Sequence, residues 1–480
     1  MTVIKRRSGV LLHVSSLHGE YSIGSFGKPA FEFVDFLAAS GFTYWQVLPF
    51  CLPDDCDSPY KSESAFAGNP YFIDLPMLAA QGLLTVEELA SAKQKTPYVT
   101  ESARLRNERE PLLRLAASRA ANRDEILAFI KERPQLDNAC RFLALKRANG
   151  GVPWQQFTVS EPCEEDYFYF AFTQFHFMRQ WKAVKSYANA KGIMLIGDLP
   201  IYVAEDSADV FGNRDQFLLD RDGLPTAVAG VPPDYFAKDG QLWGNPLYDW
   251  KRMKADDFSW WRSRMAHTLE MFDGVRIDHF RGIESYWSIP STARTAKEGR
   301  WKKGPGMAFV RAMREVAGDR LIIAEDLGDI TPEVARLVQK SGFPGMRVFQ
   351  FAFLGDPATP HLPHTYENNC VAYTGTHDNN TLLGYVWELD DARRERMLEY
   401  CGYTDADWDR GYDAILRTML GSHAGIVIFP IQDLLGFGSD TRMNTPGSSE
   451  GNWGYRMTEE QLCGLNTEKY RRFNELYGRI

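Results

Sequence analysis

The sequence predicts an α/β protein built on a (β/α)8 TIM barrel, and two observations lead to this prediction. Eight short apolar runs are separated by helical patterns along most of the chain, which is typical of repeated βα units on a parallel sheet. The 480 residues, of which 44% are apolar and 24% charged, suit one large globular barrel with insertions. We therefore expect eight strands around a closed barrel.

The predicted strands are unevenly spaced along the chain. About 145 residues separate the second from the third and about 75 separate the third from the fourth, so we expect insertions at 51–165 and 200–255 within a single barrel domain, 1–480. The first insertion includes a charged, Ala- and Leu-rich stretch at about 85–149, which predicts a helical subdomain with a solvated face. The eight predicted strands are 9–14, 44–49, 194–198, 274–278, 321–325, 347–351, 371–377 and 426–430.

Helices are predicted between these strands. The helix at 331–340 has Thr331 as its N-cap and Pro332 at its first position. The segment 166–190 has aromatic residues on two faces and is apolar on most sides, which favours a buried core helix over a sugar-stacking surface. Two further helices are predicted at 29–40 and 257–271.

Composition and charge argue against several classes of partner. The 63 acidic residues outnumber the 54 basic ones, and the resulting net charge of −9 repels a phosphate backbone, so we expect no nucleic acid partner. No apolar run reaches the roughly 18 residues of a membrane span, and His13 interrupts the run that follows the basic N-terminus. The seven cysteines lack disulfide-framework spacing. We expect a cytoplasmic protein without a membrane partner.

Metal and nucleotide sites are not predicted. The sequence has no H-E-x-x-H motif, and neither the Cys51/Cys56 pair nor the His361/His364 pair has a second pair at zinc spacing. It contains no Walker loop and no G-x-G-x-x-G after a predicted strand. We expect no cofactor.

Four predicted strands end in a carboxylate. Catalytic groups of a barrel lie where strands end and loops begin, so these positions are candidates for a site. A single acid after a strand is usually a turn or N-cap residue, but four together favour a functional cluster. The four carboxylates are Asp198, Asp278, Glu325 and Asp378.

The fourth strand also carries a cation. Side chains alternate along a strand, so Arg276 shares a face with Asp278. At about 5 Å and an effective dielectric of about 20 the pair attracts by about 3 kcal/mol, which keeps Asp278 ionised and leaves Glu325 to be pushed toward protonation. Two acids with separated pKa values are what glycosidic cleavage requires. A purely structural Arg–Asp pair is the alternative.

Aromatic and polar residues are concentrated in several predicted loops. Sugars present flat C–H faces and a rim of hydroxyls, so their sites combine aromatic platforms with polar side chains. The rigid Pro-Pro step in 230–236 favours a lid or groove wall, although simple packing is the alternative for each isolated aromatic residue. The other loops of this kind are 58–60, 241–246 and 452–453.

These motifs together resemble the 4-alpha-glucanotransferases, also called amylomaltases or disproportionating enzymes, of glycoside hydrolase family 77 in the α-amylase clan. The resemblance covers nearly the whole chain in the expected order. It implies a catalytic barrel with inserted subdomains and no separate C-terminal β domain. The motifs are SPY at 58–60, AFAGNP at 65–70, GDLP at 197–200, GVPPDYF at 230–236, WGNP at 243–246, GVRIDHFR at 274–281, AEDLG at 324–328 and TGTHDNN at 374–380.

The resemblance also implies roles for individual residues. Asp278 resembles the nucleophile, Glu325 the general acid/base and Asp378 the transition-state stabiliser. The implied substrate-binding residues are Arg276, His279 and His377 beside the scissile bond, Asp198 as a supporting carboxylate, and Tyr60, Tyr235, Phe236, Gln241 and Trp243 along the groove.

Three positions depart from the family pattern. Tyr455 stands where a second Trp is expected, and the charged Lys61 and Glu63 follow Tyr60. These departures concern groove contacts and the preferred oligosaccharide length.

The implied activity is transfer of α-1,4-glucan segments between maltooligosaccharides by a retaining double displacement through a covalent glucosyl-enzyme, with glucose as acceptor or product. An α-amylase-like hydrolase with the same carboxylates and a catalytically idle glucan-binding protein are the alternatives, because a fold does not fix a function. The presence of all three catalytic carboxylates disfavours the idle protein.

Overall fold

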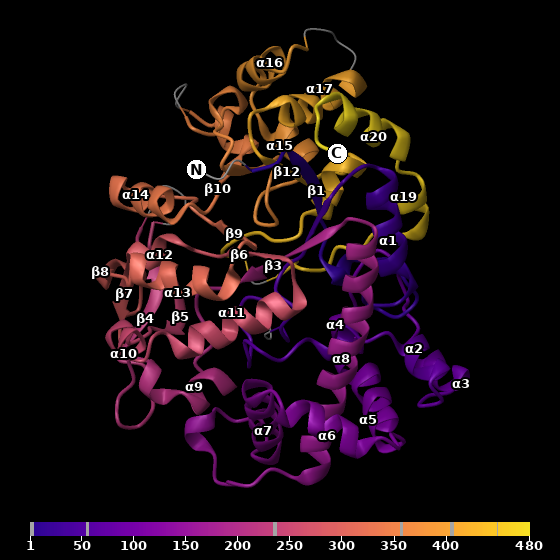
Figure 1. The fold of residues 1–480 in the computed structure, drawn as a ribbon, viewed down its shortest axis with the longest axis vertical. Helices are drawn as coiled ribbons and strands as arrows, with labels where there is room; N and C mark the ends of the chain where they lie inside the picture. The colour runs from indigo at the N-terminus through magenta and orange to yellow at the C-terminus, as the bar shows by residue number, and fades with distance from the viewer. Residues whose placement is uncertain (1–3, 54–56, 234–237, 356–358, 404–407, 449) are drawn as a thin grey trace.

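The computed structural model describes residues 4–53, 57–233, 238–355, 359–403, 408–448 and 450–480, and a closed barrel of eight parallel strands occupies its centre (Figure 1). The strands follow one another around the barrel in the order β1-β12-β11-β10-β9-β6-β3-β2. Their bounds are β1 (Arg7–Leu11), β2 (Tyr44–Gln46), β3 (Met194–Leu199), β6 (Gly274–Ile277), β9 (Leu321–Ala324), β10 (Gly345–Val348), β11 (Cys370–Tyr373) and β12 (Ile426–Pro430).

The predicted (β/α)8 barrel is confirmed, and each predicted run overlaps one of these strands. Four predicted runs end three or four residues beyond their strands, and two of them, 9–14 and 44–49, pass the ends of β1 and β2. The run 347–351 continues past β10 into a short 3-10 helix, Phe349–Phe353, and the run 371–377 continues past β11 into a loop. Most side chains of that 3-10 helix are buried, and a short buried apolar run does not reveal whether the backbone is extended or helical.

The helices surround the barrel. The longer ones are α1 (Lys28–Ala39), α5 (Glu110–Ser118), α6 (Arg123–Lys131), α7 (Pro134–Ala148), α8 (Glu164–Ala190), α11 (Ser259–Met271), α13 (Met307–Ala317), α14 (Pro332–Ser341), α16 (Asp391–Tyr400), α17 (Trp408–Gly421) and α20 (Thr467–Leu476). The shorter ones are α2 (Leu75–Ala80), α3 (Val86–Leu89), α4 (Ser102–Arg104), α9 (Ala208–Gly212), α10 (Trp250–Ala255), α12 (Arg281–Glu284), α15 (Leu382–Glu388), α18 (Ile431–Leu435) and α19 (Glu459–Cys463).

The four helices predicted with bounds are present as α1, α8, α11 and α14. The Thr331 hydroxyl caps α14 by accepting a hydrogen bond from the Val334 N–H, and Pro332 occupies the first helical position. Helix α8 is buried along most of its length, as predicted, and Trp181 meets Phe50 edge-on at a centroid distance of 4.7 Å. Helices α5, α6 and α7 pack against α8 at one side of the barrel (Figure 1).

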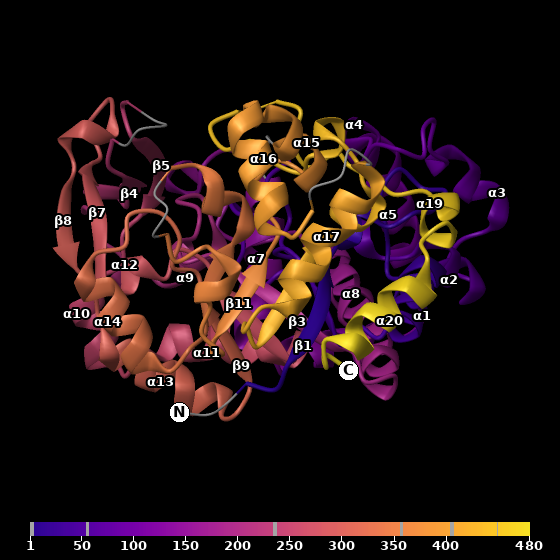
Figure 2. The same ribbon diagram turned by 90° about the horizontal axis from the view of Figure 1, so that it is seen from above.

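A second, antiparallel sheet stands beside the barrel. It contains β4 (Ala227–Val231), β5 (Gln241–Pro246), β7 (Ser285–Pro290) and β8 (Arg300–Lys303) in the order β5-β4-β7-β8, and it lies at one end of the molecule in Figure 2. This sheet is not predicted from the sequence, because its strands are short and β8 reads Arg-Trp-Lys-Lys without an apolar alternation. Strand β5 forms an edge of the sheet.

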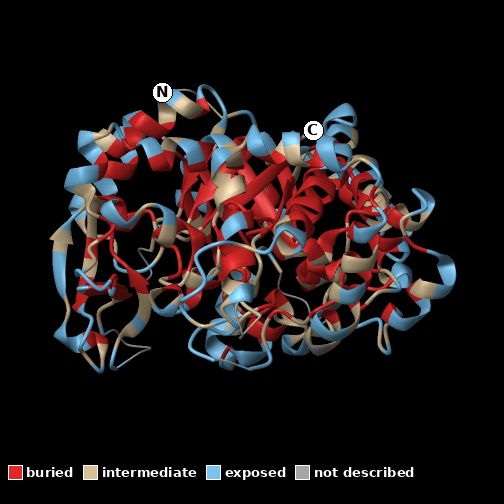
Figure 3. Ribbon diagram, turned by 90° about the horizontal axis from the view of Figure 1, so that it is seen from below, coloured by how far each residue is buried: buried red, intermediate tan, exposed pale blue. Residues whose placement is uncertain are grey.

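Alternation along β6 decides which side chains enter the barrel. Val275 and Ile277 pack with the large cluster between strands and helices, whereas the barrel interior is filled by a separate cluster that includes Ile196, Ile323 and Met346. The intervening Arg276 therefore points inward, and its Nε lies 3.4 Å from the Met346 sulfur. Figure 3 shows the buried centre of the barrel in red.

Among the helices in the described ranges, none has the length and apolarity to cross a membrane.

Gly197 in β3 provides a test of this packing. A Cβ atom there would lie 2.3 Å from the Phe272 ring, so we expect Gly197→Ala to lower the free energy of unfolding by about 1–3 kcal/mol through overpacking. Urea denaturation measures the change. Gly355→Ala is the control, because no heavy atom lies within 4 Å of its added Cβ. Equal stability of the two variants would contradict the close contact between β3 and Phe272.

Candidate active site

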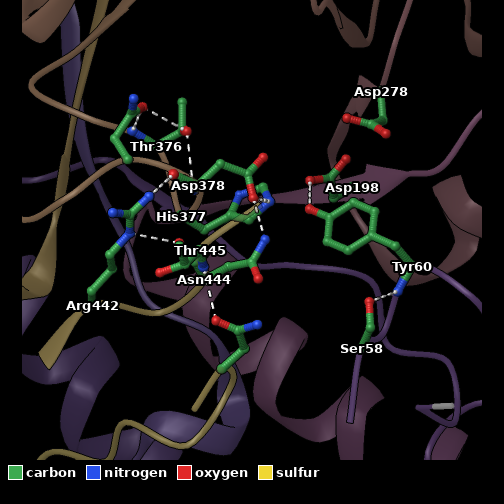
Figure 4. Close-up of polar contacts among 12 residues, drawn as sticks. Ser58, Tyr60, Asp198, Asp278, Thr376, His377, Asp378, Arg442, Asn444 and Thr445 are labelled. Carbon is green, nitrogen blue, oxygen red and sulfur yellow. Dashed lines mark hydrogen bonds and ion pairs between the residues drawn. The ribbon is translucent and has the colours of Figure 1, made fainter. Parts of the chain in front are cut away.

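The four predicted carboxylates meet at the carboxyl ends of the barrel strands. Asp198 lies near the end of β3, Asp278 and Glu325 directly follow β6 and β9, and Asp378 lies in the loop after β11. Figure 4 shows Asp198, Asp278 and Asp378 around the Tyr60 and His377 rings. Parallel strands place their ends at one rim, which explains why residues up to 180 positions apart (198 to 378) come together.

Arg276 links two of these carboxylates. Its Nη1 donates to both Asp198 oxygens at 2.8 and 2.6 Å, and its Nη2 donates to Asp278 Oδ1 at 2.7 Å. The pairing of Arg276 with Asp278 that strand alternation predicts is therefore confirmed. Burial alone would lower the pKa of Arg276, but the charges of the two aspartates raise it well above its ordinary value.

Asp198 is the most enclosed of the four acids. Its side chain is fully buried, and besides Arg276 it accepts a hydrogen bond of 2.8 Å from the Tyr60 hydroxyl (Figure 4). Burial pushes the pKa of Asp198 upward, and the Arg276 charge opposes that shift. The Tyr60 ring stacks on His377 with a centroid distance of 5.2 Å and an angle of 15°. Asp198 therefore fixes the orientation of Tyr60.

Glu325 is held by backbone groups. Its Oε2 accepts from the His279 N–H and its Oε1 from the Leu327 N–H, both at 2.7 Å. His279 adopts a left-handed backbone with φ of 51°, an uncommon conformation for a residue with a side chain. Burial, with the charge of Asp278 adding to it, raises the pKa of Glu325 to about 7, against the opposing charge of Arg276. The predicted direction of this shift is confirmed.

Asp378 is held from the other side of the cleft. Asn444 donates to its Oδ1 at 2.6 Å, and Arg442 donates to its backbone carbonyl at 2.6 Å (Figure 4). The His377 ring nitrogen lies 3.3 Å from the same carboxylate oxygen. Sequence reasoning missed Asn444 and Arg442, because they lie in a loop beyond the last strand with no motif around them.

A cleft of about 360 Å³ opens above these residues. The second sheet contributes Gln241 and Trp243 from β5, and the Trp243 indole N–H donates to the Gln241 side chain at 3.0 Å. Trp243 also meets the His279 ring edge-on at 4.9 Å. The lining residues are Ser58, Tyr60, Lys61, Pro200, Ile201, Tyr202, Gln241, Trp243, Asn245, Asp278, His377, Asp378, Asn444, Pro446, Gly447, Ser448, Asn452 and Trp453.

Most of the predicted site residues thus lie in or against one cleft. Arg276, Asp198 and His279 contact its lining residues through the interactions above. Glu325 is joined to the cleft through His279, whose ring meets Trp243. Tyr235 and Phe236 lie outside the described residues. Within the described ranges, no group of three or more His, Cys, Asp and Glu side chains could hold a metal ion.

The cleft combines aromatic platforms with carboxyl groups, which is what an oligosaccharide requires. The comparisons with known proteins agree with this chemistry. The model of glycoside hydrolase family 77, described as 4-alpha-glucanotransferase, matches residues 12–462. The chain belongs to the 4-alpha-glucanotransferase family.

Individual members of the family match along their whole length. A 4-alpha-glucanotransferase of Streptococcus pneumoniae is 43% identical over 98% of both chains, and one of Thermus thermophilus is 41% identical over 99% of this chain and 100% of its own. The solved amylomaltase of Streptococcus agalactiae, in complex with acarbose, has a TM-score of 0.94 at 36% identity, covering 99% of this chain and 100% of that one. The chain is therefore an enzyme of the glycosyltransferase type.

The three departures from the pattern of the 4-alpha-glucanotransferases have different surroundings. Lys61 lines the cleft, whereas Glu63 turns away and pairs with Lys146 at 2.6 Å. Tyr455 is buried in the main core and forms a backbone bridge with Val99, so it is not among the cleft-lining residues. The aromatic residue that the C-terminal loop contributes to the cleft is Trp453.

The Arg276 pair provides a stability test. We expect Arg276→Met to lower the free energy of unfolding by about 3–5 kcal/mol at pH 7.5, because two carboxylates lose their buried cation. Without that charge, burial raises the pKa of Asp198 further, so the folded state binds more protons than the unfolded state. Stability then falls as pH rises, and the deficit should be smaller at pH 5. Urea denaturation at both pH values measures it.

Arg252→Met is the matched control, since Arg252 forms an exposed pair with Asp215 at 3.0 Å. Loss of this pair should lower the free energy of unfolding by less than about 1 kcal/mol. An Arg276 variant no less stable than the Arg252 variant would show that the buried triad does not stabilise the fold.

Proposed function

We propose that the enzyme transfers α-1,4-glucan segments between maltooligosaccharides by a retaining double displacement, with Asp278 as nucleophile and Glu325 as general acid/base. One observation carries this proposal. Two carboxyl groups at the ends of paired strands have different environments: Asp278 has a cationic partner at 2.7 Å, whereas burial raises the pKa of Glu325 to about 7. Such a difference separates an attacking carboxylate from a proton donor.

The first half-reaction uses both groups. An Asp278 oxygen forms a bond to the anomeric carbon while the bond from that carbon to the departing glucan oxygen breaks, and Glu325 gives its proton to that oxygen. The Arg276 contact to Asp278 Oδ1 holds the nucleophile at one rotamer. The product is a β-linked glucosyl-enzyme and a shortened glucan.

The second half-reaction reverses these roles. Glu325, now ionised, takes the proton from a hydroxyl of an acceptor glucan or glucose, whose oxygen displaces Asp278 from the anomeric carbon. Two inversions give retention of configuration. A group with a pKa near 7 serves as acid and as base at neutral pH, which suits both steps.

Asp378 is proposed to stabilise the positive charge that develops on the sugar ring. Its carboxylate lines the cleft and is oriented by Asn444 and His377. The remaining proposed contacts are stacking on Tyr60 and Trp243 and hydrogen bonding to Gln241, His279 and His377.

Transfer instead of hydrolysis requires that an acceptor glucan displaces Asp278 before water does. We propose that aromatic groove residues favour the acceptor by excluding water from the intermediate. Trp243 on β5 supports this proposal from within the described residues. Tyr235 and Phe236, in the segment that joins β4 to β5, are proposed to act with it.

A cytoplasmic location is also proposed. The cysteines in the described ranges are all free thiols. Asn379 begins an Asn-x-Thr glycosylation sequence and directly follows Asp378, so a glycan on its amide nitrogen would obstruct the proposed site. Fractionation of the source cell with an antibody to the chain tests the location, and a secreted form processed near residue 20 would overturn it.

Maltotriose alone provides the test of the activity. We expect glucose together with a ladder of longer maltooligosaccharides, while total reducing ends stay nearly constant, because transfer conserves the number of glycosidic bonds. Chromatography of the products with a reducing-end assay measures both. A steady rise in reducing ends without longer products would identify a hydrolase.

The pH dependence tests Glu325. The Glu325 carboxyl group must be protonated to act as the acid in the first half-reaction. Because its pKa is about 7, kcat/KM for maltotriose should fall about tenfold per pH unit above about pH 7. An activated glucosyl fluoride, whose leaving group needs no proton, should lack this decline in the glycosylation step. A decline of the same size with both donors would remove Glu325 from the role of acid.

Substitution separates the two acids. Glu325→Gln should lose about 10²- to 10⁴-fold in transfer between maltooligosaccharides, yet it should accumulate a glucosyl group on Asp278 when given glucosyl fluoride. Asp278→Ala is the paired variant and should form no such adduct. Mass spectrometry of the peptide that contains Asp278 detects the sugar. A label on Glu325 or Asp378 would show that the roles are assigned wrongly.

A further inference from the structure

The loop 374–381, which carries Asp378, is tied at both ends to one buried carboxylate. That carboxylate belongs to Asp433 of α18, a fully buried residue. Its Oδ2 accepts a hydrogen bond of 2.5 Å from the Thr374 hydroxyl, directly after β11, and its Oδ1 accepts one of 2.8 Å from the Leu382 N–H at the start of α15. The two ends of the loop therefore share a single anchor.

Hydrogen bonds within the loop and bonds from outside it both hold the loop. The Asn379 side-chain oxygen accepts from the Thr376 N–H and hydroxyl, each at 2.8 Å, and the Thr376 oxygen accepts from the Asp378 N–H at 3.2 Å (Figure 4). From outside the loop, Gln350 donates to the Asn380 carbonyl at 2.7 Å, and Asn444 and Arg442 hold Asp378 as described above. The Asn380 side chain also donates to Glu388 and Ser439. The local bonds give the loop its shape, and the bonds from outside, together with the Asp433 anchor at each end, set where that shape lies.

Packing beneath the loop is incomplete. A cavity of about 20 Å³ lies there, lined among others by Asp433, His377 and Arg442. A space of this size has room for about one water molecule, so part of the loop is not packed directly against side chains. The position of the loop consequently depends on hydrogen bonds, and Asp433 provides one at each end.

The anchor is itself fixed. The Tyr412 hydroxyl of α17 donates to the Asp433 backbone carbonyl at 2.7 Å, and the Leu382 and Thr374 donors leave its carboxylate no rotational freedom. Burial raises the pKa of Asp433 to about 7, so a charged group at this place is costly. An apolar side chain would avoid that cost but could not accept two hydrogen bonds.

We propose that Asp433 is a positioning residue for glucan transfer, which holds the loop 374–381 so that the Asp378 carboxylate faces the sugar in the cleft. It is not among the residues that line the cleft, and it acts through the loop, which carries Asp378 and the cleft residue His377. This inference rests on the role proposed above for Asp378. Misplacing a catalytic group by about 1 Å can cost about 100-fold in rate.

Two substitutions distinguish the hydrogen bonds from the charge. Asp433→Ala removes both anchors, and we expect kcat for maltotriose to fall about 10- to 100-fold with KM changed less than about threefold. Asp433→Asn keeps both anchors. Its side-chain carbonyl oxygen can accept from the Leu382 N–H, and its side-chain NH2 group can donate to the Thr374 hydroxyl oxygen. The kcat of Asp433→Asn for maltotriose should stay within about threefold of that of the unmodified enzyme. Thr374→Val removes one anchor and serves if the Ala variant does not fold.

A double-mutant cycle separates positioning from general destabilisation. Asp378→Asn alone should lower kcat, and adding Asp433→Ala to it should lower kcat several-fold less than Asp433→Ala does in the unmodified enzyme, because no carboxylate remains to be positioned and only the contact of His377 is left. If Asp433 had only a structural role, Asp433→Ala would lower kcat in the Asp378→Asn variant as much as it does in the unmodified enzyme. Maltosyl fluoride as donor keeps the slow variants measurable.

Asn474→Ala is the matched control. Asn474 is fully buried like Asp433 and accepts from the Ser8 hydroxyl at 2.6 Å, near the start of β1 and away from the strand ends that carry the site. It should lower the melting temperature as Asp433→Ala does while leaving kcat unchanged. Comparable loss of kcat in both variants would assign the effect to stability and overturn the proposal.

Two further outcomes would overturn it. In the first, Asp378→Asn loses activity, but Asp433→Ala either keeps the kcat of the unmodified enzyme or lowers kcat by its full factor in the Asp378→Asn variant. The positioning role of Asp433 is then wrong, and the role of Asp378 stands. If Asp378→Asn keeps full activity, the role proposed for Asp378 fails, and the inference on Asp433 fails with it.

Discussion

A single buried cation organises the catalytic end of the barrel. A guanidinium inside a barrel filled with Ile, Val and Met must be neutralised and fully hydrogen-bonded, and Arg276 meets this requirement with Asp198 on one side and Asp278 on the other. Asp198 then has one further donor, the Tyr60 hydroxyl, which draws the 58–60 loop onto the barrel rim. The position of an aromatic cleft residue thus follows from the pairing of one charge.

The two central acids differ because their partners differ. Asp278 has a full positive charge beside it, whereas Glu325 accepts hydrogen bonds from neutral backbone N–H groups. One of those donors, His279, follows Asp278 directly, and its left-handed backbone turns the N–H toward Glu325. The conformation of one residue therefore couples the two carboxyl groups and keeps their environments distinct.

Much of this arrangement could be predicted from the sequence, and the rest could not for physical reasons. Apolar runs and strand-end acids predict the barrel and its four carboxylates, and a period of two predicts that Arg276 and Asp278 share a face. Asn444 and Asp433 could not be predicted, because their partners lie 66 and 59 or 51 residues away and tertiary contacts leave no local pattern. The antiparallel sheet was missed because it pairs segments on either side of β6.

The cleft is built from two sheets that share no strand. The barrel supplies the carboxylates, and the edge strand β5 of the other sheet supplies Gln241 and Trp243. An edge strand is paired on one side only, so its side chains and the turn before it can be replaced without breaking a barrel ladder. Natural selection can therefore alter the groove on one sheet while the residues proposed to break the glycosidic bond, at the strand ends of the other, remain unchanged.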